Sequence, residues 1–167
     1  MKKLWFLLLL AVGGCGGAAG DGGYPPEAPG RVQAADAVML ITSPSAVSFD
    51  GALQPNGFTA GVWCFDNSLG AMSPPTLVRG GIEIVMYDGA VSVGEISSAT
   101  PLHVWKFPGD QLSQHVGKHI RNGWGYSFQL RWGGDVPTQD RITVVARYLG
   151  GPRPVESAPS SVIVREK

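Results

Sequence analysis

A strict alternation of apolar and polar residues at positions 125–132 is the feature that most constrains the fold of this chain. Large apolar side chains occupy every second position, and they are Tyr126, Phe128, Leu130 and Trp132. Successive side chains of a β-strand point to opposite faces of a sheet, so this segment predicts a strand with one dry face and one wet face. A parallel sheet covered by helices on both faces would give continuous apolar runs, so the alternation favours an antiparallel sheet.

Further short strands are predicted where apolar or alternating segments end in turn signals, at residues 38–42, 58–65, 81–87, 90–96, 102–107, 141–149 and 161–165. Asp88-Gly89 is typical of a tight hairpin turn. One short helix is expected at residues 110–116, with Asp110 as its N-cap and Gly117 after its end. We therefore predict an all-β fold, an antiparallel immunoglobulin-like sandwich of seven or eight strands with one short helix. A small barrel is the alternative, because strand number alone does not decide closure.

The N-terminal residues have the pattern of a secretory signal. Lys2 and Lys3 precede an apolar run at residues 4–12 that contains no polar side chain. A helix needs about 20 apolar residues to cross a bilayer, so this run is too short for a stable span. Its length and its flanking charge indicate an export signal.

The signal ends in Val12-Gly13-Gly14-Cys15, which resembles the lipobox of bacterial lipoproteins. The commonest lipobox has Leu where this chain has Val12. The resemblance implies that Cys15 receives lipid and that the signal is removed directly before it; several acyl chains on one cysteine suffice for stable anchoring. By the same resemblance, Gly16 after the cysteine, rather than Asp, implies the outer membrane. Ordinary signal cleavage within residues 16–20 is the alternative, and it would leave a soluble protein.

These patterns divide the chain into a lipoprotein signal peptide at residues 1–14, a flexible Gly/Pro-rich tether at 15–36 and a β-sandwich domain at 37–167. The tether has little apolar surface to bury. Removal of residues 1–14 leaves 167 − 14 = 153 residues, with 13 − 2 = 11 basic and 13 acidic side chains. This slightly acidic balance argues against nucleic acid as a partner, and we expect a monomer.

The second cysteine, Cys64, is predicted to be buried. A single cysteine beside the lipidated one cannot form an internal disulfide, so packing must stabilise the fold. Its neighbours in Val62-Trp63-Cys64-Phe65 are apolar, a setting that predicts an inert thiol.

The second half of the chain resembles uncharacterised sandwich domains of bacterial lipoproteins. The similar features are Trp105-Lys106-Phe107, a short polar helix, the alternation at 125–132, Arg141, Arg147-Tyr148 and a final short strand. The resemblance covers residues 38–165 and consists of core positions, so it implies a fold and no activity.

Two motifs that could carry chemistry are incomplete. His115 and His119 have a spacing that lets two histidines bind zinc from one helix face, but Val116 stands where a metalloprotease has Glu, and Gly117 lies between them. Ser92 lies in a sequence that resembles a nucleophile elbow, a motif that requires a strand-to-helix turn, whereas Ser92 lies within a predicted strand. We therefore predict no catalytic residue, no metal and no cofactor, and we expect that the protein is not an enzyme.

Tryptophans raise the alternative of a carbohydrate-binding module, in which exposed rings stack on sugars; the four considered are Trp63, Trp105, Trp124 and Trp132. All but Trp124 lie in predicted strands, where large aromatic side chains usually pack in a core. Trp124 lies in a predicted turn and is the candidate for an exposed ring.

Residues 111–134 contain no acidic side chain. Arginine and tryptophan are typical anchors of interfaces, so Lys118, Arg121 and Trp124 are the predicted partner-binding residues. A solvated loop without a partner is the alternative. The sequence thus predicts a membrane-anchored lipoprotein of the cell envelope, a non-enzymatic binding or structural module with a protein or glycan partner. An envelope-attached carbohydrate-binding module is the alternative function.

Overall fold

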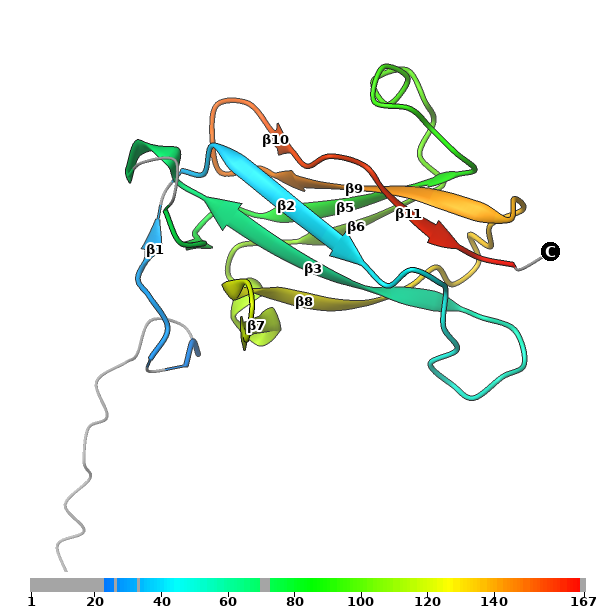
Figure 1. Ribbon diagram of the computed structural model, residues 1–167, viewed down its shortest axis with the longest axis horizontal. Helices are drawn as coiled ribbons and strands as arrows, with labels where there is room; N and C mark the ends of the chain where they lie inside the picture. The colour runs from blue at the N-terminus through cyan, green and yellow to red at the C-terminus, as the bar shows by residue number, and fades with distance from the viewer. Residues whose placement is uncertain (1–22, 26, 33, 70–72, 166–167) are drawn as a thin grey trace, which may run out of the picture.

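The chain forms two antiparallel sheets that pack face to face (Figure 1). This computed structural model describes residues 23–25, 27–32, 34–69 and 73–165. The first sheet, called here the β3–β8 sheet, has the order β2 (Ala37–Thr42), β3 (Gly57–Phe65), β8 (Gly123–Arg131) and β7 (Val116–His119). The second, the β5–β9 sheet, has the order β10 (Val155–Glu156), β9 (Arg141–Tyr148), β5 (Ile82–Asp88) and β6 (His103–Phe107). Strand β11 (Ser160–Ile163) also pairs with β9.

Short elements complete the fold at the end where the N-terminal segment enters. Strand β1 (Arg31–Val32) pairs in parallel with β4 (Leu77–Val78). The 3-10 helix η1 (Asn67–Leu69) follows β3, and a second 3-10 helix, η2 (Leu112–His115), leads directly into β7.

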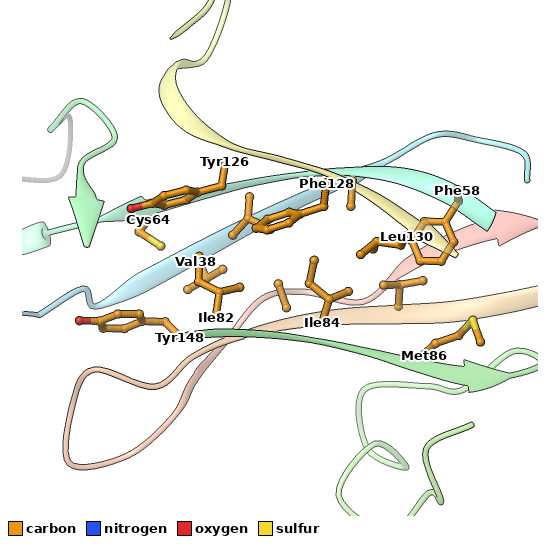
Figure 2. Packing of buried hydrophobic residues seen from close by; sticks show 14 of the residues in the cluster. Val38, Phe58, Cys64, Ile82, Ile84, Met86, Tyr126, Phe128, Leu130 and Tyr148 are labelled. Atoms are coloured by element: carbon orange, nitrogen blue, oxygen red, sulfur yellow. The ribbon is translucent and has the colours of Figure 1, made fainter. Parts of the chain in front are cut away.

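The core lies between the sheets, where the inward side chains of the two layers meet (Figure 2). Strands β3 and β8 contribute Phe58, Tyr126, Phe128 and Leu130, and β5 and β9 contribute Ile82, Ile84, Met86 and Tyr148. Each such side chain stabilises the fold by about 1.5–3 kcal/mol through burial. One polar group of this layer is also satisfied, because the Val78 N–H donates to the hydroxyl of Tyr126 at 2.8 Å.

The predicted all-β antiparallel sandwich is confirmed. The alternation that led to it forms β8, whose even-numbered side chains from Tyr126 to Leu130 are buried while Ser127 and Gln129 are exposed. The strand order is that of the A-B-E-D and F-C strands of an immunoglobulin sandwich, with β2, β3, β8 and β7 in one sheet and β9 and β5 in the other. This order favours the immunoglobulin-like interpretation, which stays a prediction.

Residues 90–96 do not form the predicted strand. Gly89 makes the expected turn, with a φ of 84°, but the chain then leaves the sheet in a series of turns. The Ser92 N–H and hydroxyl both donate to the Glu95 carboxylate, at 2.9 and 2.6 Å, and hold one of these turns. Ile96 packs on the outer side of the β5–β9 sheet against Val85 and Tyr87. Local side-chain bonding therefore overrides the alternation of this segment.

The predicted helix at residues 110–116 is shorter than expected. Only the 3-10 helix η2 forms, and its N-cap is Gln111, without a side-chain hydrogen bond, rather than Asp110. Leu112 is fully buried and fixes this turn to the core. Residues from Val116 onward pair with β8 as the edge strand β7, because pairing satisfies more backbone groups than one further helical turn.

Part of the segment predicted as a tether lies against the domain. Tyr24, Ala28 and Val32 pack on the core cluster, and the Arg31 guanidinium lies 4.9 Å from the centre of the Tyr24 ring. The packed chain therefore begins before Ala37. The predicted signal peptide, Cys15 and the first part of the tether lie outside the described residues.

Candidate functional site

The outward face of the β3–β8 sheet carries an open groove of about 790 Å³, called here the outer groove. Thr59 and Gly61 on β3 lie opposite Gln129 and Ser127 on β8, and these four form its floor. The complete lining is Ile41, Thr42, Ser43, Thr59, Ala60, Gly61, Trp63, His115, His119, Ser127, Phe128 and Gln129. This lining contains no Asp, Glu, Lys or Arg, so the groove suits a neutral ligand with both polar and apolar surfaces.

Trp63 forms one end of the outer groove; its side chain is buried, as the sequence predicted, but it lies on the outward face of the sheet and outside the core cluster between the sheets. A Cβ atom on Gly61 would lie 2.5 Å from the ring atom Cη2 of Trp63, and one on Gly125 would lie 2.6 Å from Nε1. The indole therefore occupies the space that side chains at these two glycines would fill. Trp63 is only 3% exposed, and its Nε1 is buried without a hydrogen-bond partner.

An unpartnered buried indole N–H costs about 1–3 kcal/mol of stability. The His119 ring packs edge-on against this indole, with 4.9 Å between ring centres. This N–H lies nearest Gly125, which is not part of the groove lining, whereas Cη2 and Cζ3 of the ring lie over Gly61, which is, so the groove meets the ring edge and not the N–H.

Two histidines form the other wall of the groove. His119 Nε2 lies 3.1 Å from the Ser127 hydroxyl, and His115 Nδ1 donates to the Ser127 carbonyl at 3.3 Å. The His115 ring also contacts Phe128, with 4.6 Å between ring centres. The two imidazoles are thus held in place by Ser127 and by aromatic neighbours, and they present polar edges at a fixed position.

One serine–histidine contact lies in the outer groove, and its setting differs from that of a nucleophile elbow. The Ser127–His119 pair resembles a nucleophile and its base, but Ser127 lies in the middle of a strand rather than on an exposed turn. Within the described part of the chain, no group of three or more His, Cys, Asp or Glu side chains is arranged to hold a metal ion. His115 and His119 do not share a helix face, since one belongs to η2 and the other to β7.

Lys118, Arg121 and Trp124 are brought together by the β7–β8 hairpin. Lys118 lies opposite Trp124 in the strand register, and its Nζ is 6.0 Å from the centre of the indole ring. Arg121 is exposed in the turn. Trp124 belongs to β8 and packs partly on the core, so it is less exposed than a turn position suggested. The patch is therefore two cations around a half-buried indole.

The third histidine, His103, is half-buried and pairs with a carboxylate at the other end of the sandwich. His103 Nδ1 lies 2.5 Å from Asp135 Oδ2, and its ring lies 4.4 Å from that of Trp105. The Trp105 N–H donates to the Arg131 carbonyl at 3.1 Å. These bonds tie β6 to the end of β8 and to the loop after it, which is a structural role.

The Cys64 side chain is fully buried and free, as the sequence predicted. Burial raises the pKa of its thiol to about 12. Since the thiolate is the reactive form, Cys64 is inert in the folded protein.

Comparison of the chain with protein-family models, with curated proteins and with solved structures gives no significant match. Among the residues that the structure describes, none belongs to a helix long and apolar enough to cross a membrane. The functional interpretation therefore depends on the residues of this chain alone.

Proposed function

We propose that this chain is a lipid-anchored cell-envelope protein of the outer membrane whose β-sandwich is a non-enzymatic binding module. The anchor is the lipidated Cys15, and the module presents the outer groove to a partner. The observation that carries the proposal is the groove itself, which combines a neutral lining of hydroxyl, amide and apolar groups with two fixed imidazoles. Pockets that combine apolar walls with a few placed polar groups are the usual form of a binding site.

The two cysteines support the anchoring part of the proposal. Cys15 follows an apolar run and two small residues, which is the position that lipid attachment requires. Cys64 is buried and its thiol is held in the unreactive form. In the folded domain Cys64 is therefore not a site for lipid attachment.

Metabolic labelling with a fatty acid tests this part. The wild-type protein is expected to take up label and to sediment with membranes, and Cys15→Ala is expected to lose both properties. Cys64→Ala is the matched control, and it should keep label and membrane association. Persistent labelling of Cys15→Ala, or loss of label in Cys64→Ala, would show that the anchor is not Cys15.

A carbohydrate-binding module is the second candidate, and the chemistry of the outer groove favours it. Sugars are neutral, carry many hydroxyl groups and have apolar faces, and the groove offers hydroxyl, amide and imidazole groups beside apolar side chains. Ser127, Gln129 and His119 are the groups placed to bind hydroxyls. Trp63 offers only the edge of its ring and no open ring face, because only 3% of the residue is exposed.

Titration with neutral oligosaccharides, followed by tryptophan fluorescence, tests the second candidate. Binding should quench or shift the emission, and Gln129→Ala and His119→Ala should each weaken it by about tenfold, since one lost hydrogen bond to a ligand is worth about 1.4 kcal/mol. Gln114→Ala is the control, because Gln114 is exposed one residue before His115 and outside the groove lining. An equal effect of all three variants would contradict glycan binding in this groove.

A further inference from the structure

The turn of the β7–β8 hairpin presents an aliphatic side chain between cations. Ile120 is fully exposed, with a relative accessibility of 104%. Lys118 and Arg121 on either side are exposed as well, and neither forms an ion pair among the described residues. A single exposed isoleucine is ordinary, but one flanked by unpaired cations has the composition of a membrane-surface contact.

The hairpin holds this turn in a defined position. His119 lies opposite Gly123 in the strand register, and Gly123 has a φ of 72°, which a side chain would disfavour. A Cβ at Gly123 would lie 3.5 Å from Pro75, so the turn also packs against the loop before β4. Trp124 packs on the core directly below. Because the turn is ordered in advance, docking it costs little conformational entropy.

The N-terminal segment enters the domain at the same end of the sandwich. The first residue of β2 pairs with the last residue of β3, and β8 begins toward that end of β3. A Cβ at Gly23 would lie 3.7 Å from the Ser113 hydroxyl, in the 3-10 helix that leads into β7. Figure 1 shows the blue N-terminal segment beside β7 and the C-terminus at the opposite end.

Chain length limits how far this end can be from the membrane. Cys15 and Gly23 are 23 − 15 = 8 residues apart, and a chain spans at most about 3.5 Å per residue, or about 28 Å in all. If Cys15 carries the lipid, Gly23 therefore stays within about 28 Å of the bilayer surface. This step rests on the proposed function.

The charges of the two ends favour one orientation. The loops at the opposite end, residues 43–56, 89–102 and 132–140, contain four acidic side chains, Asp50, Glu95, Asp135 and Asp140, and one cation, Arg165, binds the last of these loops. At the hairpin end, Lys118 and Arg121 stand with Asp66 and Asp110, so that end is the less acidic of the two. An anionic lipid surface would repel these loops and attract Lys118 and Arg121. Chain length and charge thus both predict that the end of the domain with the β7–β8 hairpin faces the membrane.

We propose that the β7–β8 hairpin docks on the anionic surface of the membrane that holds the lipid anchor. Ile120 enters the boundary between headgroups and acyl chains, and Lys118 and Arg121 contact lipid phosphates. The outer groove lies on the outward face of the same sheet and stays open to a partner while the hairpin is docked.

A fluorescent reporter on the full, lipidated protein tests this proposal. In Asn122→Cys the new thiol is the one reactive site, since Cys15 is acylated and Cys64 is buried, and a polarity-sensitive dye is attached there. Leu53→Cys is the control, because Leu53 is fully exposed, at 105%, in a loop of the opposite end, whereas Asn122 is half-exposed in the hairpin turn; each protein is compared with itself in the absence of phosphatidylglycerol. Both proteins are placed on phosphatidylcholine vesicles with and without phosphatidylglycerol, and flotation of the vesicles is measured separately.

With phosphatidylglycerol present, the dye at position 122 is expected to shift to shorter wavelength and to be quenched by a lipid-borne quencher, while the dye at position 53 is not. Replacing Lys118 and Arg121 by Gln should shift the docking equilibrium toward the undocked state by about 30-fold, at about fivefold for each lost charge. Ile120→Asp should abolish the spectral shift. Protein that floats while the dye at 122 stays in water overturns the docking proposal alone. Protein that fails to float overturns the anchor and the docking proposal together.

Discussion

The two faces of the β3–β8 sheet are built from the same strands and differ in almost every physical respect. The inward face is a continuous apolar layer in which Phe58, Tyr126 and Phe128 are buried. The outward face alternates with it residue by residue, yet holds glycines, hydroxyls and an amide around the edge of Trp63. The inward face determines the fold, so the outward face is free to carry a binding site.

The largest expected effect comes from the inward face. Phe128→Ala should lower the free energy of unfolding by about 3–5 kcal/mol, because it leaves a cavity beside Phe107 and the opposite sheet. Denaturant unfolding followed by circular dichroism measures this loss. A change below about 1 kcal/mol would mean that β8 is not the core strand that the structure describes.

Gly125→Ala tests whether the outward face tolerates an added side chain beside Trp63. A Cβ there would lie 2.6 Å from Trp63 Nε1 and 2.9 Å from the Val62 carbonyl oxygen. We expect a loss of about 1–3 kcal/mol, as for other overpacked sites. Gly134→Ala is the control, since nothing lies within 4 Å of its Cβ position. Equal stability of the two variants would contradict the position of Trp63.

Tyr126→Phe removes one polar contact from the inward face without removing a ring. The Val78 N–H would lose its acceptor at 2.8 Å in a buried setting, which costs about 1–2 kcal/mol. Thermal unfolding is compared with that of Tyr87→Phe, whose hydroxyl accepts from the partly exposed guanidinium of Arg147. The comparison separates an acceptor for a buried backbone N–H from an acceptor for a guanidinium that solvent reaches. The comparison fails if Tyr87→Phe is the more destabilised of the two.

The smallest expected change is on the outward face. Ser127→Ala removes the 3.1 Å contact with His119, in a position that solvent reaches, and should change stability by less than about 0.5 kcal/mol. The same variant should weaken ligand binding, which a destabilised core variant would affect only through unfolding. A large loss of stability in Ser127→Ala would mean that the groove is part of the folding core.

The fold could be predicted because burial of one sheet face makes apolar and polar residues alternate along a strand. The prediction failed where another interaction is stronger. Residues 125–132 alternate strictly and form β8. Residues 90–96 alternate as well, but the Ser92–Glu95 hydrogen bonds fold them into turns. Strand β7 was missed because it is four residues long, contains Gly117 and lies at a sheet edge, so nothing in its own sequence reports its pairing with β8.

The site was less predictable than the fold, because it is assembled from segments distant in sequence. Lys118, Arg121 and Trp124 were found from local composition, and one hairpin does bring them together. The outer groove was missed, because its lining comes from β2, β3, η2, β7 and β8. The sequence held one indication of this groove. Gly61 and Gly125 lie on the same face of the sheet as Trp63, and small residues beside a tryptophan indicate that its ring lies across them.

Site-specific photocrosslinking in the membrane-anchored protein tests most directly whether the outward face binds a partner. A photoreactive amino acid replaces Thr59 in the floor of the outer groove or, as a control, Gln114 just outside it. Our account predicts an adduct of defined mass from position 59 that disappears in Ser127→Ala and is absent from position 114. The account is contradicted if position 59 gives no adduct, or if both positions give the same products.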